Sequence, residues 1–105
     1  MCFNKSEMHE THYRASRFCR VLGNPTAYLI VKCLQVRSMT VKELTDLTGI
    51  SLTTISMTLR HLRQIEIVRY ETIGLQKTYW LKSPVLNSIF DLIENWVDDM
   101  RLVLP

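Results

Sequence analysis

Residues 40–64 read TVKELTDLTGISLTTISMTLRHLRQ, a stretch that holds two helix start signals and one stop signal. Thr40 and Glu43 have the spacing of a capping box, in which the Thr hydroxyl and the Glu carboxylate each satisfy a backbone N–H that the helix leaves free. Gly49 has no Cβ and suits a left-handed helix exit, and Ser51 is a favoured cap for the next helix. The stretch therefore predicts two helices joined by a three-residue turn, which is the helix-turn-helix arrangement.

The second helix of this pair is predicted to have one apolar and one polar face. Its apolar residues recur at helical steps and are expected to be buried: Leu52, Ile55, Leu59 and Leu62. At about 100° per residue, the opposite face holds Thr53, Met57, Arg60 and Gln64, with Thr54, Ser56 and His61 at its flanks. Such a face is typical of any solvated surface helix, but its hydroxyls and arginine also suit contacts with phosphates and base edges. The neighbouring elements must decide between these interpretations.

Two further helices are predicted before the pair. Gly23 and Pro25 separate a first helix, predicted over residues 6–22, from a short second helix that begins near Pro25. The apolar residues on one face of the first helix are Met8, Ala15, Phe18, Cys19 and Leu22. Those expected to point inward from the second helix are Leu29, Ile30, Cys33 and Leu34.

A β-hairpin is predicted after the pair. Residues 67–72 and 77–81 are rich in β-branched and aromatic side chains, and the tip between them contains a glycine. Arg69, Gln76 and Lys77 make this hairpin basic and polar. A tight helix-turn-helix followed by such a hairpin favours nucleic-acid binding, with the hairpin as a wing along the DNA backbone. The residues predicted to contact DNA are Ser51, Thr53, Thr54, Ser56, Met57, Arg60, His61, Gln76 and Lys77.

Ser83 and Pro84 supply a cap and a first-turn proline for a last helix. Its apolar stripe consists of Val85, Leu86, Ile89, Phe90, Ile93, Trp96, Val97 and Met100. Its other face carries Asp91, Glu94, Asp98 and Asp99. This stripe has more large side chains than a small domain needs from its terminal helix, so part of it is expected to face a partner. The alternative is that the stripe only closes the core of its own domain.

The composition predicts one domain that spans residues 1–105. The chain is 47% hydrophobic, which is enough for a single core. The net charge is only +3, but residues 1–82 hold twelve Lys or Arg and six acids, and residues 83–105 hold one Arg and four acids. Three widely spaced cysteines with no signal peptide before them predict thiols in a reducing cytosol. No apolar run approaches the roughly 18 residues of a membrane helix, so we expect a soluble, cytoplasmic protein.

Three segments resemble the ArsR family of winged helix-turn-helix repressors. Residues 22–26, LGNPT, are similar to the family's opening of the second helix, and residues 40–44, TVKEL, to the start of its third. Residues 49–63, GISLTTISMTLRHLR, resemble its recognition segment. The ordered set covers nearly the whole chain and implies a mainly α fold of five helices with a small β-hairpin wing.

The chain departs from the family pattern at three positions. Ala27 stands where the family usually has Arg, and Thr58 where it usually has His, which removes two potential contacts to DNA. Glu66 stands where a Gly commonly ends the recognition helix. A left-handed exit is costly for a residue with a Cβ, so this helix is free to end differently here.

The resemblance implies a homodimer in which the first and last helices pair across a two-fold axis. The residues predicted at this interface are Phe18, Leu22, Ile89, Phe90, Ile93, Trp96, Val97 and Met100. The family's metal sensors use cysteines in the third helix, or carboxylates and imidazoles in the last one. Neither set is present in this sequence, so no metal or other cofactor is predicted.

Two other effector sites stay open. Cys2, His9, His12 and Cys19 lie near the N-terminus and are weak candidates for a soft metal, and Cys19 in the core, a free Cys2 and two solvated histidines are the favoured explanation. Cys19 and Cys33 are candidates for thiol sensing, but Cys33 among apolar neighbours also fits inert core packing.

The function predicted from the sequence is that of a transcription regulator. A homodimeric repressor would occupy a double-stranded DNA operator until an effector, a metal, a thiol-reactive species or another molecule, released it. The alternative is a winged-helix dimerisation or protein-interaction module without specific DNA binding. An enzyme is not expected, because the sequence has no Gly-rich phosphate loop, nucleophile elbow or metalloprotease motif.

Overall fold

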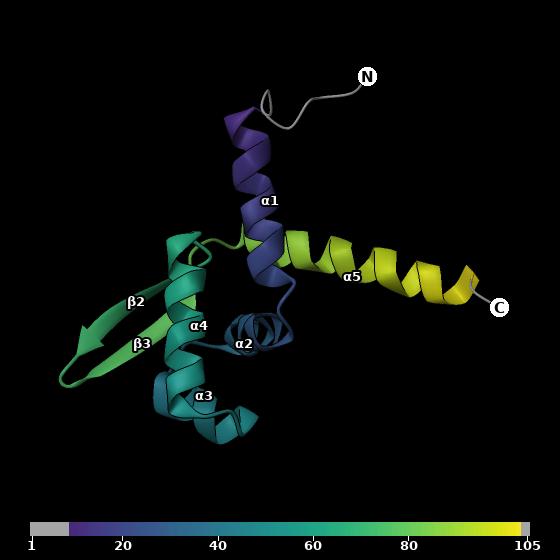
Figure 1. Ribbon diagram of the computed structural model, residues 1–105. Helices are drawn as coiled ribbons and strands as arrows, with labels where there is room; N and C mark the ends of the chain where they lie inside the picture. Colours follow the sequence, from purple (N-terminus) through teal and green to yellow (C-terminus); the bar gives the residue numbers. More distant parts are fainter. Residues whose placement is uncertain (1–8, 104–105) are drawn as a thin grey trace.

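The computed structural model describes residues 9–103 and contains five helices and a three-stranded antiparallel sheet (Figure 1). The elements in chain order are α1 (Glu10–Leu22), α2 (Pro25–Val36), β1 (Met39–Thr40), α3 (Val41–Thr48), α4 (Leu52–Gln64), β2 (Val68–Ile73), β3 (Gln76–Leu81) and α5 (Val85–Val103). The strand order is β1-β3-β2. This is the winged helix-turn-helix architecture predicted from the sequence.

The helix-turn-helix forms as its local signals predict. The Thr40 hydroxyl accepts a hydrogen bond from the Glu43 N–H at 3.1 Å, and the Glu43 carboxylate accepts one from the Thr40 N–H at 3.0 Å. Gly49 ends α3 in the left-handed region with φ 74°. The Ser51 hydroxyl accepts from the Thr54 N–H at 3.2 Å and caps α4. The capping box, the stop and the second cap are therefore confirmed.

The two helices before this pair differ from the prediction only at one end. α2 begins at Pro25, with the Asn24 side chain accepting hydrogen bonds from the next two free N–H groups. α1 as described begins at Glu10, because the His9 backbone is outside the helical region and its Nδ1 accepts from the Thr11 N–H; the predicted start at residue 6 lies outside the described residues. Met8 lies outside the described residues.

The wing is longer and tighter than predicted. β2 continues to Ile73, which pairs with Gln76, so the turn contains only Gly74 and Leu75. Gly74 has φ 65°, which allows this two-residue connection. A third strand, β1, was missed by the sequence analysis: its two residues pair with Tyr79 and Thr78 of β3 and close the sheet on the side of α3.

The end of α4 corrects one expectation. Glu66 adopts φ 62°, so the chain leaves the helix in the left-handed conformation although the residue is not glycine. Its carboxylate is ion-paired with the Lys82 ammonium after β3, and this contact lowers the pKa of Glu66. The ion pair joins the exit of the helix to the base of the wing, where β3 ends.

The core lies where α2, α3 and α4 meet the base of the wing and the start of α5. Ile30, Leu44, Ile55, Leu62 and Phe90 are fully buried there. Two residues predicted to be buried, Leu29 and Leu52, are exposed, and so is Cys19, for which a place in the core was one of the explanations. All three follow the helical step, but the other described elements leave these side chains largely uncovered.

The helix α5 extends away from the body in the direction opposite to the wing (Figure 1). Its first turns contribute Leu86 and Phe90 to the core. Its later apolar side chains are exposed, with Trp96 at 69% of its full accessibility. Within the described part of the chain, no helix is long and apolar enough to cross a membrane.

Candidate nucleic-acid interface

The exposed face of α4 carries the side chains predicted to read DNA. Thr53, Met57, Arg60 and Gln64 are all exposed, while Ile55, Leu59 and Leu62 on the opposite face are buried. Neither the Thr53 hydroxyl nor the Arg60 guanidinium has a hydrogen-bond or ionic partner among the described residues. Both groups are therefore free to contact an external acceptor.

The hydroxyls at the start of α4 form a short chain. Ser51 Oγ donates to Thr54 Oγ1 at 3.0 Å, and Thr58 Oγ1 donates to the Thr54 carbonyl at 2.7 Å. The Ser51 hydroxyl is thus fully engaged in capping the helix. The Thr54 hydroxyl accepts from Ser51 and keeps its own proton as a donor, so Thr54 is better placed than Ser51 to contact a phosphate.

The wing is held against α4 by a stack of cations on tyrosine. Arg63 of α4 lies 5.1 Å from the centre of the Tyr70 ring, and Lys77 of β3 lies 4.8 Å from it. Tyr70 in turn contacts Tyr79, with ring centres 5.3 Å apart. Cation–π contacts of this kind fix the approach of the wing to the helix. Arg63 was not singled out in the sequence, because its role depends on Tyr70 from the next element.

A hollow of about 290 Å³ lies between α4 and the wing tip. It brings together Ser56 of α4 with Gln76 and Lys77 of β3, three residues predicted from the sequence to contact DNA. It also includes Lys42 of α3, which the sequence analysis missed. His61 lies on the other flank of α4, in a second hollow that α1 helps to line.

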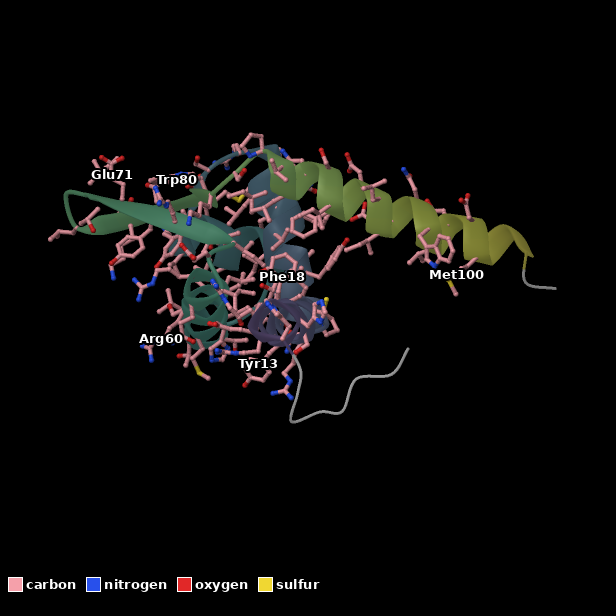
Figure 2. The ribbon with its side chains drawn as sticks, turned by 90° about the horizontal axis from the view of Figure 1, so that it is seen from above. Tyr13, Phe18, Arg60, Glu71, Trp80 and Met100 are labelled. Carbon is pink, nitrogen blue, oxygen red and sulfur yellow. The ribbon has the colours of Figure 1, made fainter. Side chains whose placement is uncertain are left out.

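The acidic side chain on the wing points away from this face. Glu71 pairs with Thr78 and shares a sheet face with Trp80, whereas Tyr70 and Lys77 share the face toward α4. Figure 2 shows Glu71 and Trp80 on the opposite side of the molecule from Arg60. The polar face of α4 and the cations beside it therefore lie on one side of the molecule, and the only carboxylate of the wing, that of Glu71, lies on the other side.

The predicted dimer residues divide into two groups. Leu22 and Phe90 are buried by their own chain and have almost no surface left for a partner. Phe18 and Ile89 are half-buried, and Ile93, Trp96, Val97 and Met100 are exposed along α5. Leu92, which was not predicted, adds to the exposed apolar surface at 69%.

A polar network attaches α5 to α2. The Tyr28 hydroxyl donates to Glu94 Oε2 at 2.6 Å, and Lys32 Nζ donates to Glu94 Oε1 at 3.0 Å. Burial and the hydrogen bond to Glu94 raise the pKa of Tyr28 to about 12. The hydrogen bonds from Tyr28 and Lys32 hold the pKa of Glu94 below its usual value. The sequence placed Glu94 on the face opposite the apolar stripe of the last helix and gave it no partner, so this contact is an addition to the prediction.

The candidate effector residues do not form a built site in the described chain. Cys19 is exposed and Cys33 is buried, and both are free thiols. Burial raises the pKa of Cys33. The His9 and His12 rings lie 5.8 Å apart, but no group of three potential metal ligands occurs within residues 9–103. Cys2 lies outside the described residues.

This geometry defines a winged helix-turn-helix protein. The second helix of its helix-turn-helix, α4, presents a free polar face beside a β-hairpin. Among models of protein families, residues 24–70 match the bacterial regulatory protein, arsR family. The matched segment holds α2, the helix-turn-helix and the start of the wing, so the predicted resemblance to the ArsR family is confirmed over this segment. The matched family is one of regulatory proteins and not of enzymes, in agreement with the prediction.

Solved structures extend the likeness to almost the whole chain. HlyU from Vibrio cholerae is 20% identical with a TM-score of 0.75, over 85% of this chain and 97% of its own. NolR from Sinorhizobium fredii is 25% identical with a TM-score of 0.78, over 90% and 95%. A homodimeric winged helix-turn-helix DNA-binding domain from Mycobacterium bovis is 21% identical with a TM-score of 0.82, over 95% and 93%. A search of curated protein sequences gives no match.

Proposed function

We propose that this chain is a single-domain, homodimeric transcription repressor that binds a specific DNA operator. The observation that carries the proposal is the unpartnered polar face of α4, on which Thr53 and Arg60 are exposed and have no partner within the described chain. The alternative, a helix face that is only exposed to solvent, does not explain why a cation-bearing wing is held beside it. The stacking of Lys77 and Arg63 on Tyr70 supports a surface built for a polyanion.

In this proposal α4 lies in the major groove. Arg60 is long enough to bind a guanine edge through two hydrogen bonds, and Thr53 and Thr54 contact base edges or phosphates near the start of the helix. Gln76 and Lys77 follow the adjacent backbone from the wing. The helix thus supplies sequence discrimination and the wing supplies charge.

The dimer follows from the exposed apolar stripe of α5. Trp96 and Met100 are at least half exposed in the single chain, which is costly for side chains of this size at consecutive turns. The M. bovis domain with the same fold is homodimeric, which supports a dimer here. Pairing through α1 and α5 would place two α4 helices about 34–36 Å apart on a near-palindromic site.

Repression and release make use of the same architecture. A dimer on an operator that overlaps a promoter blocks transcription in the cytoplasm. An effector that changes the dimer shifts the spacing of the two recognition helices and so lowers the affinity for DNA. The link between Tyr28 and Glu94 connects the dimer helix to α2, which packs on α4, and offers a route for this coupling.

The test compares binding of the purified protein to the DNA upstream of its own gene and to unrelated DNA, at about 150 mM salt to suppress non-specific attraction. We expect specific binding by a dimer. Arg60→Ala should lower discrimination between the two DNAs by about 5- to 150-fold while the dimer persists, since a bidentate base contact is worth about 1–3 kcal/mol.

Arg69→Ala is the matched control, because Arg69 is exposed on the wing but shares the sheet face of Glu71 and Trp80. It removes the same charge and should leave the discrimination unchanged. Equal, weak binding of the unmodified protein to both DNAs would contradict the repressor function and favour a protein-interaction module. Unchanged discrimination in Arg60→Ala would remove Arg60 from the residues that read the sequence.

A further inference from the structure

The flank of α4 opposite the wing carries a second basic surface. There α1, the start of α2 and the second half of α4 enclose a hollow of about 340 Å³. Its polar lining comes mainly from Arg17 and Arg20 of α1 and from His61 and Gln64 of α4. None of the residues that line it is acidic.

The two arginines are unpaired cations. Arg17 and Arg20 are both exposed, lie one turn apart on α1, and have no ion pair or hydrogen bond among the described residues. Guanidinium groups keep their charge and bind tetrahedral oxyanions through paired N–H donors. Ala27 and Thr58, two positions with short side chains, leave room between the helices for such an anion.

This hollow continues the proposed DNA-reading face. Gln64 belongs to both surfaces, because it is exposed beside Arg60 and also lines the hollow. At about 100° per residue, His61 lies on one side of that face, and Ser56 and Arg63 lie on the side of the wing. Figure 2 shows that Tyr13, on the same helix as the arginines, is on the same side of the molecule as Arg60.

We infer that Arg17 and Arg20 bind a backbone phosphate of the DNA, on the strand that borders α4 opposite the wing. The inference rests on the proposed function. A helix in the major groove has a phosphate backbone along each of its flanks. The wing provides Lys77 for one backbone, and α1 provides the two arginines for the other. A free phosphate would have the same chemistry, but the shared Gln64 places this site against the groove.

The experiment measures the affinity for operator and unrelated DNA between 50 and 200 mM salt. Arg17→Ala and Arg20→Ala should each lower the affinity for both DNAs by the same factor and keep the discrimination. Each should reduce the slope of log affinity against log salt by about 1, so that the unmodified protein loses about fourfold more affinity than either variant over this range. Arg14→Ala is the matched control: it removes one exposed arginine from the same helix, does not line the hollow, and should keep the slope.

A second measurement locates the phosphate. Operator probes with single methylphosphonate groups remove one backbone charge at a time, and one position should weaken binding of the unmodified protein but not of Arg17→Ala. Circular dichroism and mass measurement establish that the variants are folded and dimeric. If the unmodified protein binds its operator and both variants keep its slope and its methylphosphonate profile, the inference is overturned and the proposed function stands.

Absence of specific binding by the unmodified protein would instead refute the proposed function itself. Inorganic phosphate at constant ionic strength separates the two phosphate sources. If it binds the unmodified protein but not Arg17→Ala, while the salt slopes of the two are equal, the site takes a free anion and the assignment to DNA is wrong.

Discussion

Removal of one oxygen atom, by Tyr28→Phe, tests whether α5 is held on the body by the network of Tyr28, Lys32 and Glu94. The phenol ring should keep its place, because it packs edge-on against Phe90 with ring centres 5.9 Å apart and does not depend on the hydroxyl. Only the 2.6 Å hydrogen bond to Glu94 is lost. The substitution therefore isolates one polar contact between the second and the last helix.

The expected cost is about 1 kcal/mol in the free energy of unfolding. A hydrogen bond to a charged group contributes about 1.5–3 kcal/mol when it is well shielded. The Glu94 and Lys32 side chains are 39% and 37% exposed, so solvent screening reduces this figure. For a domain of this size, a loss of about 1 kcal/mol lowers Tm by about 4–8 °C.

The pH dependence follows from the two pKa shifts. The pKa of Glu94 is lowered in the folded state, so its contribution is present above the unfolded pKa of about 4.3 and is lost as pH falls through the folded value. The pKa of Tyr28 is raised to about 12, so the hydroxyl donates fully below about pH 10 and loses its proton as pH rises toward the folded value. The difference between Tyr28→Phe and the unmodified protein should therefore be constant at neutral pH and shrink in acid.

Urea unfolding at a fixed protomer concentration measures this difference, because the stability of a dimer depends on concentration. Tyr13→Phe is the control, since Tyr13 is an exposed tyrosine of α1 whose hydroxyl has no partner within the described chain. A double-mutant cycle with Glu94→Gln should give a coupling of about 1 kcal/mol at pH 7. A coupling of zero, or equal stability of Tyr28→Phe and the unmodified protein, would refute the role of the network.

Two further predictions concern the dimer and the thiols. Trp96→Glu should convert the dimer to a monomer in a mass measurement by light scattering while the helical content is kept, because Trp96 is 69% exposed in the single chain; a persistent dimer would place the interface elsewhere. In a protein with Cys2→Ser and Cys19→Ser, maleimide should label Cys33 only as the protein unfolds, because Cys33 is buried and its pKa is raised; rapid labelling of the folded protein would revive thiol sensing at Cys33.

The helix-turn-helix could be predicted because its signals act over a few residues. Thr40 with Glu43, Gly49 and Ser51 satisfy or redirect the backbone of their own turn, so no distant partner is needed. The exposed face of α4 followed from the helical step in the same way. The helical periodicity shows which residues share a face of the helix, but it does not show how much of that face the other elements cover. Leu29 and Leu52 were therefore predicted to be buried and are exposed.

The features that the sequence missed depend on contacts between distant segments. β1 has two residues and no pattern of its own, and it exists because Tyr79 and Thr78 of β3 lie beside it. Glu94 meets Tyr28 across 66 positions of the chain. Glu66 keeps a left-handed backbone while ion-paired with Lys82, whose position is set by the length of the wing. Arg17 and Arg20 could not be assigned to a binding surface from the sequence, because that surface forms only where α1 lies beside α4.

The basic and the acidic residues, which are unevenly distributed along the chain, also lie in different parts of the fold. The basic residues of α1, α4 and the wing lie on both flanks of the polar face of α4. Asp91, Asp98 and Asp99 are exposed on α5, which leads away from the wing (Figure 1). A phosphate backbone attracts the first group and repels the second, so the field of the protein favours an approach with α4 toward the DNA. A net charge of only +3 is therefore compatible with binding to a polyanion, because the surface proposed to meet DNA carries the excess of positive charge.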